Sequence, residues 1–182
     1  MANLLTAIRL LLVIPVTLAF ALPALLSPLL LILMLVVAVI TDYFDGPLAR
    51  RLGTAPPAGM LFDHSTDFVF VTCGLAGAAW AGLLTPLLPV LIVVAFSQYV
   101  LDSYFWYRQK RLRMSRLGRL NGIFYFVPLF IIAAARLPLP PELSTVLLDL
   151  SRLVAWALLA STLASIADRA LAPLKIHTPS QS

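Results

Sequence analysis

Charged residues are scarce in this sequence. Only 12% of its 182 residues are Asp, Glu, Lys or Arg, and 61% are hydrophobic, whereas soluble domains average roughly 25% charged residues. A chain of this length leaves a large share of its surface exposed, and so few charged side chains could not cover that surface in water. The shortage therefore excludes an ordinary soluble domain and favours a protein of the lipid bilayer.

Cysteine and histidine are almost absent as well. Cys73 is the single cysteine, which excludes a disulfide within the chain, and two histidines complete the set. So few Cys and His residues offer no zinc site. Because Cys73 lies in an apolar run, we expect it to be a small buried side chain. Oxygen remains the ligand type that could hold a metal ion.

Long apolar runs occupy most of the chain. Polar residues and prolines divide it into six stretches near the length of about 20 residues that a helix needs to cross the hydrocarbon. None alternates in polarity as a transmembrane β-strand does. We predict an all-α membrane protein, a bundle of six transmembrane helices within residues 1–174, followed by a short polar tail over residues 175–182. The predicted helices are 6–24, 28–48, 59–83, 86–107, 117–136 and 143–171.

Basic residues predict the topology, because cytoplasmic loops are enriched in Lys and Arg. If the N-terminus is cytoplasmic, the outer side keeps only Arg136 and Arg152. We therefore expect both termini in the cytoplasm, a polar cleft that opens there, and a bacterial-type plasma membrane as the location. The inner basic residues are Arg9, Arg50, Arg51, the group 108–119, Arg169 and Lys175.

Nucleic-acid binding and secretion fit the sequence less well than a membrane bundle does. The net charge of +5 would suit nucleic acid, but the basic residues lie between apolar runs instead of on one face of a soluble helix, so we predict no nucleic-acid partner. The apolar run after Arg9 resembles a secretory signal, but it is long and offers no clear small-residue cleavage site.

Four aspartates, Asp42, Asp45, Asp63 and Asp67, fall at the adjoining ends of the second and third apolar stretches. Ionisable groups in membrane segments usually face a polar cavity, pair with one another or bind something. The first two are three residues apart and the last two are four apart, so each pair shares one helix face. We expect the four carboxylates to meet in one cleft and to bind Mg²⁺, Mn²⁺ or Ca²⁺, which prefer oxygen ligands.

Small residues and an arginine accompany the aspartates. Gly46 and Gly59 remove side chains where a ligand or another helix must come close, and Ala49 nearly does the same. Arg50 lies one turn beyond Gly46 and can present a planar fork to a phosphate group. The pattern predicts a pyrophosphate-binding site beside the carboxylates.

These residues resemble the signature of the CDP-alcohol phosphotransferase family. The start of the chain, with Asn3, Leu4, Leu5, Thr6 and Arg9, also resembles the entry to the first helix in many members. Six helices and this length fit the family over nearly the whole chain. The signature reads Asp42-x-x-Asp45-Gly46-x-x-Ala49-Arg50, then eight residues, then Gly59-x-x-x-Asp63-x-x-x-Asp67.

The resemblance implies a reaction without a covalent enzyme intermediate, in which the acceptor hydroxyl attacks the phosphate nearer the lipid and CMP leaves. It implies two Mg²⁺ or Mn²⁺ ions held by Asp42, Asp45 and Asp63, while Asp67 completes the second site and accepts the hydroxyl proton. The residues that it implies for contact with the CDP moiety are Thr6, Asp42, Gly46, Ala49, Arg50, Gly59 and Asp63.

The resemblance further implies that the chain moves a phosphatidyl group from CDP-diacylglycerol to a small polar alcohol in phospholipid synthesis. The small size favours this branch. The alternative is a CDP-choline or CDP-ethanolamine type of enzyme with diacylglycerol as the acceptor, to which the stretch Phe62-Asp63-His64 is more similar. His64 itself lies at a different helix angle from its aspartate neighbours, so it need not be a ligand.

The acceptor pocket would draw on the later helices. Arg113, Arg116, Arg119 and Asp102 are the candidates, and so many cations favour a phosphorylated alcohol such as glycerol 3-phosphate or inositol phosphate. The basic group could instead anchor the chain to anionic lipid headgroups, and Asp102 could pair with a neighbouring arginine. We expect Asp168 and Arg169 to be interfacial.

Other classes of protein would use the same aspartates differently. They could form a structural metal clip or a network of ion pairs, a path for divalent cation transport, or the diphosphate site of a prenyltransferase. Transport of a bare cation needs neither the arginine nor the glycines of the signature. Gly74, Gly77 and Gly82 let helices approach closely, which suits a bundle and a homodimer.

Overall fold

The computed structural model describes residues 2–51, 57–101 and 116–175, and within them every regular element is a helix. Its side chains are described over residues 5–43, 64–101 and 117–170. Asp102 and Arg113 lie outside the described residues. The helices are α1 (Ala2–Ala21), α2 (Pro28–Arg51), α3 (Pro57–Trp80), α4 (Leu87–Leu101), α5 (Arg116–Phe124), α6 (Phe126–Ala135) and α7 (Pro141–Lys175).

The all-helical prediction is confirmed over the described residues, and each predicted stretch contains a helix. One boundary differs because of proline: α1 ends at Ala21, before Pro23, since the residue preceding a proline avoids the helical conformation. The predicted stretch 117–136 contains two helices, α5 and α6. The last part of the predicted stretch 86–107 lies outside the described residues.

The end of α3 follows from its glycine. Gly82 has a φ of 72°, a left-handed conformation that costs glycine little. The amide of Leu83 donates to the carbonyl of Ala78 at 3.0 Å, and the amide of Gly82 donates to that of Ala79 at 2.9 Å. This is the Schellman arrangement, which satisfies the last carbonyls of a helix.

The break between α5 and α6 lies at Tyr125. Pro128 follows one turn later and has no amide hydrogen for the carbonyl of Phe124, which interrupts the helical hydrogen bonding. The two helices still form one apolar stretch, Leu117–Ala135. The break therefore falls inside a potential membrane segment.

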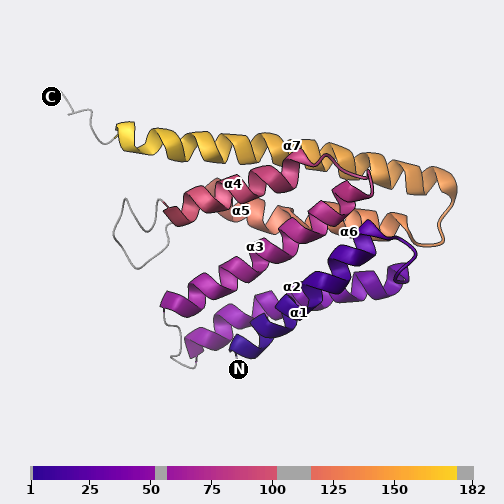
Figure 1. Cartoon of the computed structure of the whole chain (residues 1–182), viewed down its shortest axis with the longest axis horizontal. Helices are drawn as coiled ribbons and strands as arrows, with labels where there is room; N and C mark the ends of the chain where they lie inside the picture. Colours follow the sequence, from indigo (N-terminus) through magenta and orange to yellow (C-terminus); the bar gives the residue numbers. More distant parts are fainter. Residues whose placement is uncertain (1, 52–56, 102–115, 176–182) are drawn as a thin grey trace.

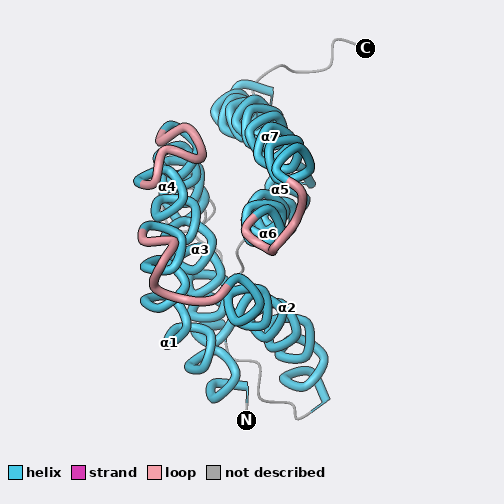
Figure 2. Tube along the Cα trace, turned by 90° about the vertical axis from the view of Figure 1, so that its right-hand side faces the viewer, coloured by secondary structure: helices cyan, strands magenta, loops and turns pink. Residues whose placement is uncertain are grey.

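The helices contact one another in a ring. α1 packs on α3 and α2, α3 on α4, α4 on α7, α7 on α6, and α6 on α2, with a further contact between α3 and α6 across the ring. Figure 2 shows α4, α3 and α1 along one side and α7, α5, α6 and α2 along the other. The start of α1, the ends of α2, α4 and α7, and the starts of α3 and α5 lie at one end of the bundle, at the left of Figure 1.

Glycines set the closest helix contacts. A methyl group on Gly77 of α3 would collide with the backbone carbonyl of Thr17 on α1, and one on Gly74 would lie 3.2 Å from the side chain of Leu129 on α6. The prediction of close packing is confirmed at these two positions. It is wrong for Gly82, where nothing lies within 4 Å of such a methyl group, because this glycine ends α3.

Arg136, directly after α6, contacts the end of α1. Its guanidinium donates to the carbonyls of Ala19 at 2.6 Å and Phe20 at 2.9 Å, and it lies 5.4 Å from the centre of the Phe20 ring. The last carbonyls of α1 have no partners in their own helix, and a cation is favourable there. Arg136 thus fastens the end of α6 to the end of α1.

Two stretches among the described residues, Leu117–Ala135 and Pro141–Ala170, are long and apolar enough to cross a membrane, and most of their residues are not buried. Shorter apolar helices cover Leu5–Ala21, Pro28–Tyr43 and Leu87–Leu101. The core helix of a soluble protein would hide its apolar side chains, whereas large ones face outward here. They include Leu11, Ile14, Leu29, Trp80, Leu153 and Trp156, each more than half exposed.

Candidate active site

A cavity of about 550 Å³ lies inside the ring, between α2, α3, α4, the α5–α6 pair and α7. Its wall runs along the α5–α6 pair from Gly118 to Phe130, which is about 18 Å along a helix. Most of the wall is apolar, and the rings of Phe68 and Phe96 stack there with their centres 4.0 Å apart. The polar side chains that line it are Asp42, His64, Asp67, Tyr99, Arg119, Asn121, Tyr125, Thr162, Ser165 and Arg169.

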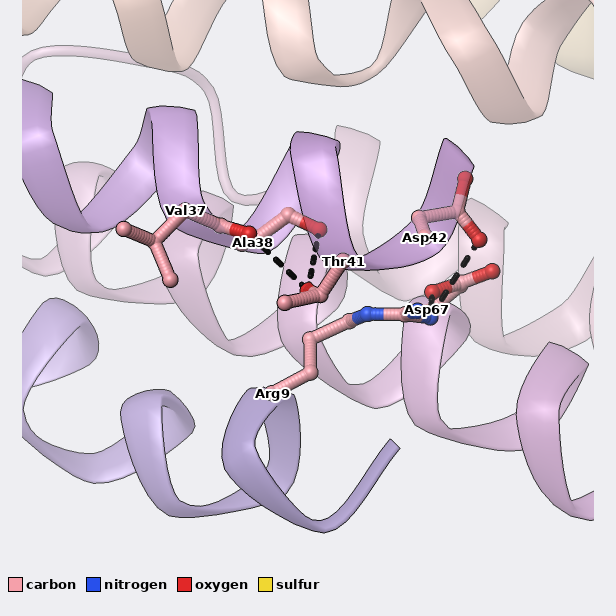
Figure 3. Close-up of polar contacts among 6 residues, drawn as sticks. All are labelled: Arg9, Val37, Ala38, Thr41, Asp42 and Asp67. Atoms are coloured by element: carbon pink, nitrogen blue, oxygen red, sulfur yellow. Dashed lines mark hydrogen bonds and ion pairs between the residues drawn. The ribbon is translucent and has the colours of Figure 1, made fainter. Parts of the chain in front are cut away.

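Two carboxylates at this cavity meet on one arginine. Arg9 of α1 donates to Oδ1 of Asp67 on α3, and the same Nη1 atom lies 3.4 Å from Oδ1 of Asp42 on α2. Figure 3 shows both carboxylates pointing toward the Arg9 guanidinium from their separate helices. The Arg9 side chain is fully buried, whereas those of Asp42 and Asp67 are 43% and 25% exposed.

Thr41, the neighbour of Asp42, takes no part in this cluster. Its hydroxyl contacts the carbonyls of Val37 and Ala38 on its own helix, each at 2.9 Å, as Figure 3 shows. Such a hydroxyl satisfies itself within the helix. Asp42 is therefore the polar side chain that α2 presents to the site among its described residues.

Hydrogen bonds between α5 and α7 line the opposite wall. Ser161 donates to the side-chain carbonyl of Asn121 at 2.7 Å, and the hydroxyls of Tyr125 and Thr162 lie 2.7 Å apart. Because Tyr125 stands at the break between α5 and α6, its bond to Thr162 supports that break. These contacts hold together the part of the cavity wall that Asn121, Tyr125 and Thr162 line.

A second cation lies on the same wall. Arg169 of α7 lines the cavity, and its guanidinium lies 5.0 Å from the centre of the Tyr99 ring on α4. The face of an aromatic ring attracts a cation, so Tyr99 holds this arginine at the cavity edge. Arg119 of α5 also lines the cavity and is exposed. The site therefore combines two carboxylates, three arginines and a mostly apolar wall.

Residues 1–169 match the family model described as CDP-alcohol phosphatidyltransferase. The chain belongs to this family. Comparisons with curated proteins and with solved structures gave no significant match.

The family decides between the functional classes. A CDP-alcohol phosphatidyltransferase is a phosphotransferase that takes a phosphatidyl group from a CDP-alcohol, in phospholipid synthesis. Membership of this family therefore favours phosphatidyl transfer over cation transport and over prenyl transfer. Together with the apolar helices, it also makes the chain a membrane protein.

The structure describes part of the predicted phosphatidyltransferase signature. Asp42 and Asp67 lie at the cavity. The other signature residues lie on the helical backbone of α2 or α3, and their side chains are outside the described ones; they are Asp45, Gly46, Ala49, Arg50, Gly59 and Asp63. Thr6 is buried in α1 one turn before Arg9.

The acceptor candidates divide in the same way. Arg119 lines the cavity. Arg116 begins α5, but its side chain lies outside the described ones. Asp102 and Arg113 lie outside the described residues.

A divalent metal fits what is described of this site. Carboxylate oxygens are the ligands that Mg²⁺ and Mn²⁺ prefer, and Asp42 and Asp67 already converge on a cation, the Arg9 guanidinium. No group of three or more acidic, His or Cys side chains gathers among the residues described with side chains. Two of the four predicted ligands, Asp45 and Asp63, fall outside that part of the chain.

Sequence reasoning missed several residues of the site. Arg9 was expected to be one more basic residue of the inner side, yet it is buried against the carboxylates. Arg169 was expected at the membrane interface, yet it lines the cavity. Asn121 and Thr162 gave only a weak signal, as polar residues inside apolar stretches.

Proposed function

We propose that the enzyme transfers the phosphatidyl group of CDP-diacylglycerol to the hydroxyl of a small polar alcohol and releases CMP. The observation that carries this is the cavity, whose lining combines the carboxylates of Asp42 and Asp67 with mostly apolar side chains from α3, α4 and the α5–α6 pair. A lipid with a charged headgroup likewise has one polar part and one long apolar part. The polar part of the donor would lie beside Asp42 and Asp67.

The signature residues would divide the work. Asp42, Asp45, Asp63 and Asp67 would hold two Mg²⁺ or Mn²⁺ ions, which supply charge for the phosphoryl oxygens and the leaving phosphate. Asp67 would accept the proton of the acceptor hydroxyl, because a carboxylate within reach of that hydroxyl is a suitable general base. The CDP moiety would contact Thr6, Gly46, Ala49, Arg50 and Gly59.

The acceptor would be anionic. Arg119 and Arg169 are the described cations of the cavity, and guanidinium groups bind phosphate oxygens in pairs. The phosphate of an alcohol such as glycerol 3-phosphate or inositol phosphate could bind both of these arginines. Arg113, Arg116 and Asp102 remain further acceptor candidates.

In the membrane, the chain would form a bundle of six spans with both termini in the cytoplasm. The ends of α2, α4 and α7 lie at the same end of the bundle as the start of α1. Arg119, near the start of α5, and Arg169, near the end of α7, belong to that end, as expected for a cytoplasmic side. A homodimer and a bacterial plasma membrane remain part of this proposal.

The test is a panel of acceptors with the purified protein and two donor systems. CDP-diacylglycerol is offered with glycerol 3-phosphate, inositol phosphate, inositol or serine, and CDP-choline is offered with diacylglycerol. The product lipids are identified by mass. We expect product from CDP-diacylglycerol and a phosphorylated acceptor. Phosphatidylcholine from CDP-choline would establish the alternative branch, and products from serine or inositol alone would contradict an anionic acceptor.

A further inference from the structure

The buried position of Arg9 needs a cause that packing does not supply. The side chain is 0% exposed, and burying a guanidinium is costly unless charges of opposite sign compensate it. Its Nη1 atom contacts both Asp42 and Asp67. Two predicted metal ligands therefore compensate the charge of Arg9 among the described side chains.

Arg9 in turn compensates the charge of Asp42 and Asp67. Two carboxylates that converge in a membrane protein repel each other unless a cation lies between them. Asp42 and Asp67 come from different helices, α2 and α3, and Arg9 reaches both from a third, α1. Figure 3 shows the guanidinium below both carboxylates. The pair can thus form before any metal ion binds.

We infer that Arg9 is the internal counter-cation of the aspartate pair, a positioning residue that holds Asp42 and Asp67 together and offsets their charge when no metal is bound. This inference rests on the metal site of the proposed function. A carboxylate has two oxygens, so one can contact Arg9 while the other binds a second cation. A bound divalent ion and Arg9 then share the same negative charge.

Sharing the charge has a measurable consequence. With metal absent, loss of the Arg9 charge removes a cation from the two carboxylates and destabilises the fold. With metal bound, the ion compensates them, so the same loss costs less. A variant without the Arg9 charge therefore loses more stability in the metal-free state than in the metal-bound state. Because the free-energy difference between the two states grows, the variant binds the metal more tightly.

The experiment compares wild type, Arg9→Met and the control Arg152→Met in detergent. Arg152 is a half-exposed side chain that pairs with Asp149 on the same helix. Mn²⁺ binding is measured by electron paramagnetic resonance, and thermal unfolding is measured in EDTA and in Mg²⁺. For Arg9→Met we expect Mn²⁺ to bind about tenfold tighter and the melting temperature to fall more in EDTA than in Mg²⁺. The control should change neither the affinity nor the difference between EDTA and Mg²⁺.

Equal losses in EDTA and Mg²⁺, unchanged or weaker Mn²⁺ binding by Arg9→Met, or no Mn²⁺ binding by the wild type would overturn the inference. If Arg9→Met fails to fold even in Mg²⁺, the double variant Arg9→Met with Asp67→Asn removes one charge of each sign and should fold again. Its failure to fold would also overturn the inference. No readout uses a CDP substrate, so a protein that behaves as expected here but releases no CMP would refute the proposed function alone.

Discussion

Arg9 donates a hydrogen bond to the carboxylate of Asp67 across 58 residues of sequence. The bond joins α1 to α3 at the polar end of the cavity, where Asp42 of α2 meets the same guanidinium. Close packing of α1 on α3 makes it possible, because Gly77 lets the two backbones approach near Thr17. A glycine contact and an ion pair thus position the same two helices.

The first prediction concerns Asp67 as the base. Asp67→Asn removes a proton acceptor but keeps one oxygen, so we expect CMP release to fall by about 10³-fold while part of the Mn²⁺ binding remains. The matched control is Asp149→Asn, which changes an exposed carboxylate paired with Arg152 and should keep wild-type turnover. Turnover by Asp67→Asn near that of the wild type would remove Asp67 as the base.

The second prediction concerns the acceptor. Arg169→Gln removes a cation that lines the cavity beside Tyr99, so we expect the KM for a phosphorylated acceptor to rise about tenfold with little change in kcat. The KM for CDP-diacylglycerol should stay the same, and Arg152→Gln should change neither constant. A fall in kcat at constant acceptor KM would show that Arg169 does not bind the acceptor.

The third prediction separates two glycines. Gly77→Ala places a methyl group against the backbone carbonyl of Thr17, so we expect a loss of about 1–3 kcal/mol in the free energy of unfolding. Gly122→Ala is the control, because nothing lies within 4 Å of the added methyl group and alanine favours a helix by up to about 1 kcal/mol. Thermal unfolding in detergent checks both, and equal stability of the two variants would refute the close approach of α1 and α3.

The fourth prediction concerns the opposite end of the bundle. Arg136→Met removes two charged hydrogen bonds to the last carbonyls of α1, and we expect a loss of about 2 kcal/mol. Arg152→Met removes an exposed ion pair, worth about 0–1 kcal/mol, and a long exposed hydrogen bond of 3.4 Å to the Leu83 carbonyl. The two variants are compared by thermal unfolding, and a loss for Arg136→Met no larger than for the control would show that the contact with α1 adds no stability.

Much of the fold could be predicted because apolar length and prolines determine helix positions in a membrane. The pairing of the aspartates from their spacing stays a prediction, because the side chains of Asp45 and Asp63 lie outside the described ones. The position of Arg9 could not be predicted, because a lone arginine in an apolar run does not reveal which helix it will contact. The break at Tyr125 and the cavity wall at Arg169 depend likewise on packing between helices distant in sequence.

The most direct test of the central claim is CMP release from CDP-diacylglycerol by the purified protein, measured together with the product lipid. The account predicts one CMP for each phosphatidyl product, formed only when both a divalent metal and an acceptor alcohol are present, and lost after addition of EDTA. CMP release without an acceptor, or product formation in EDTA, would contradict it.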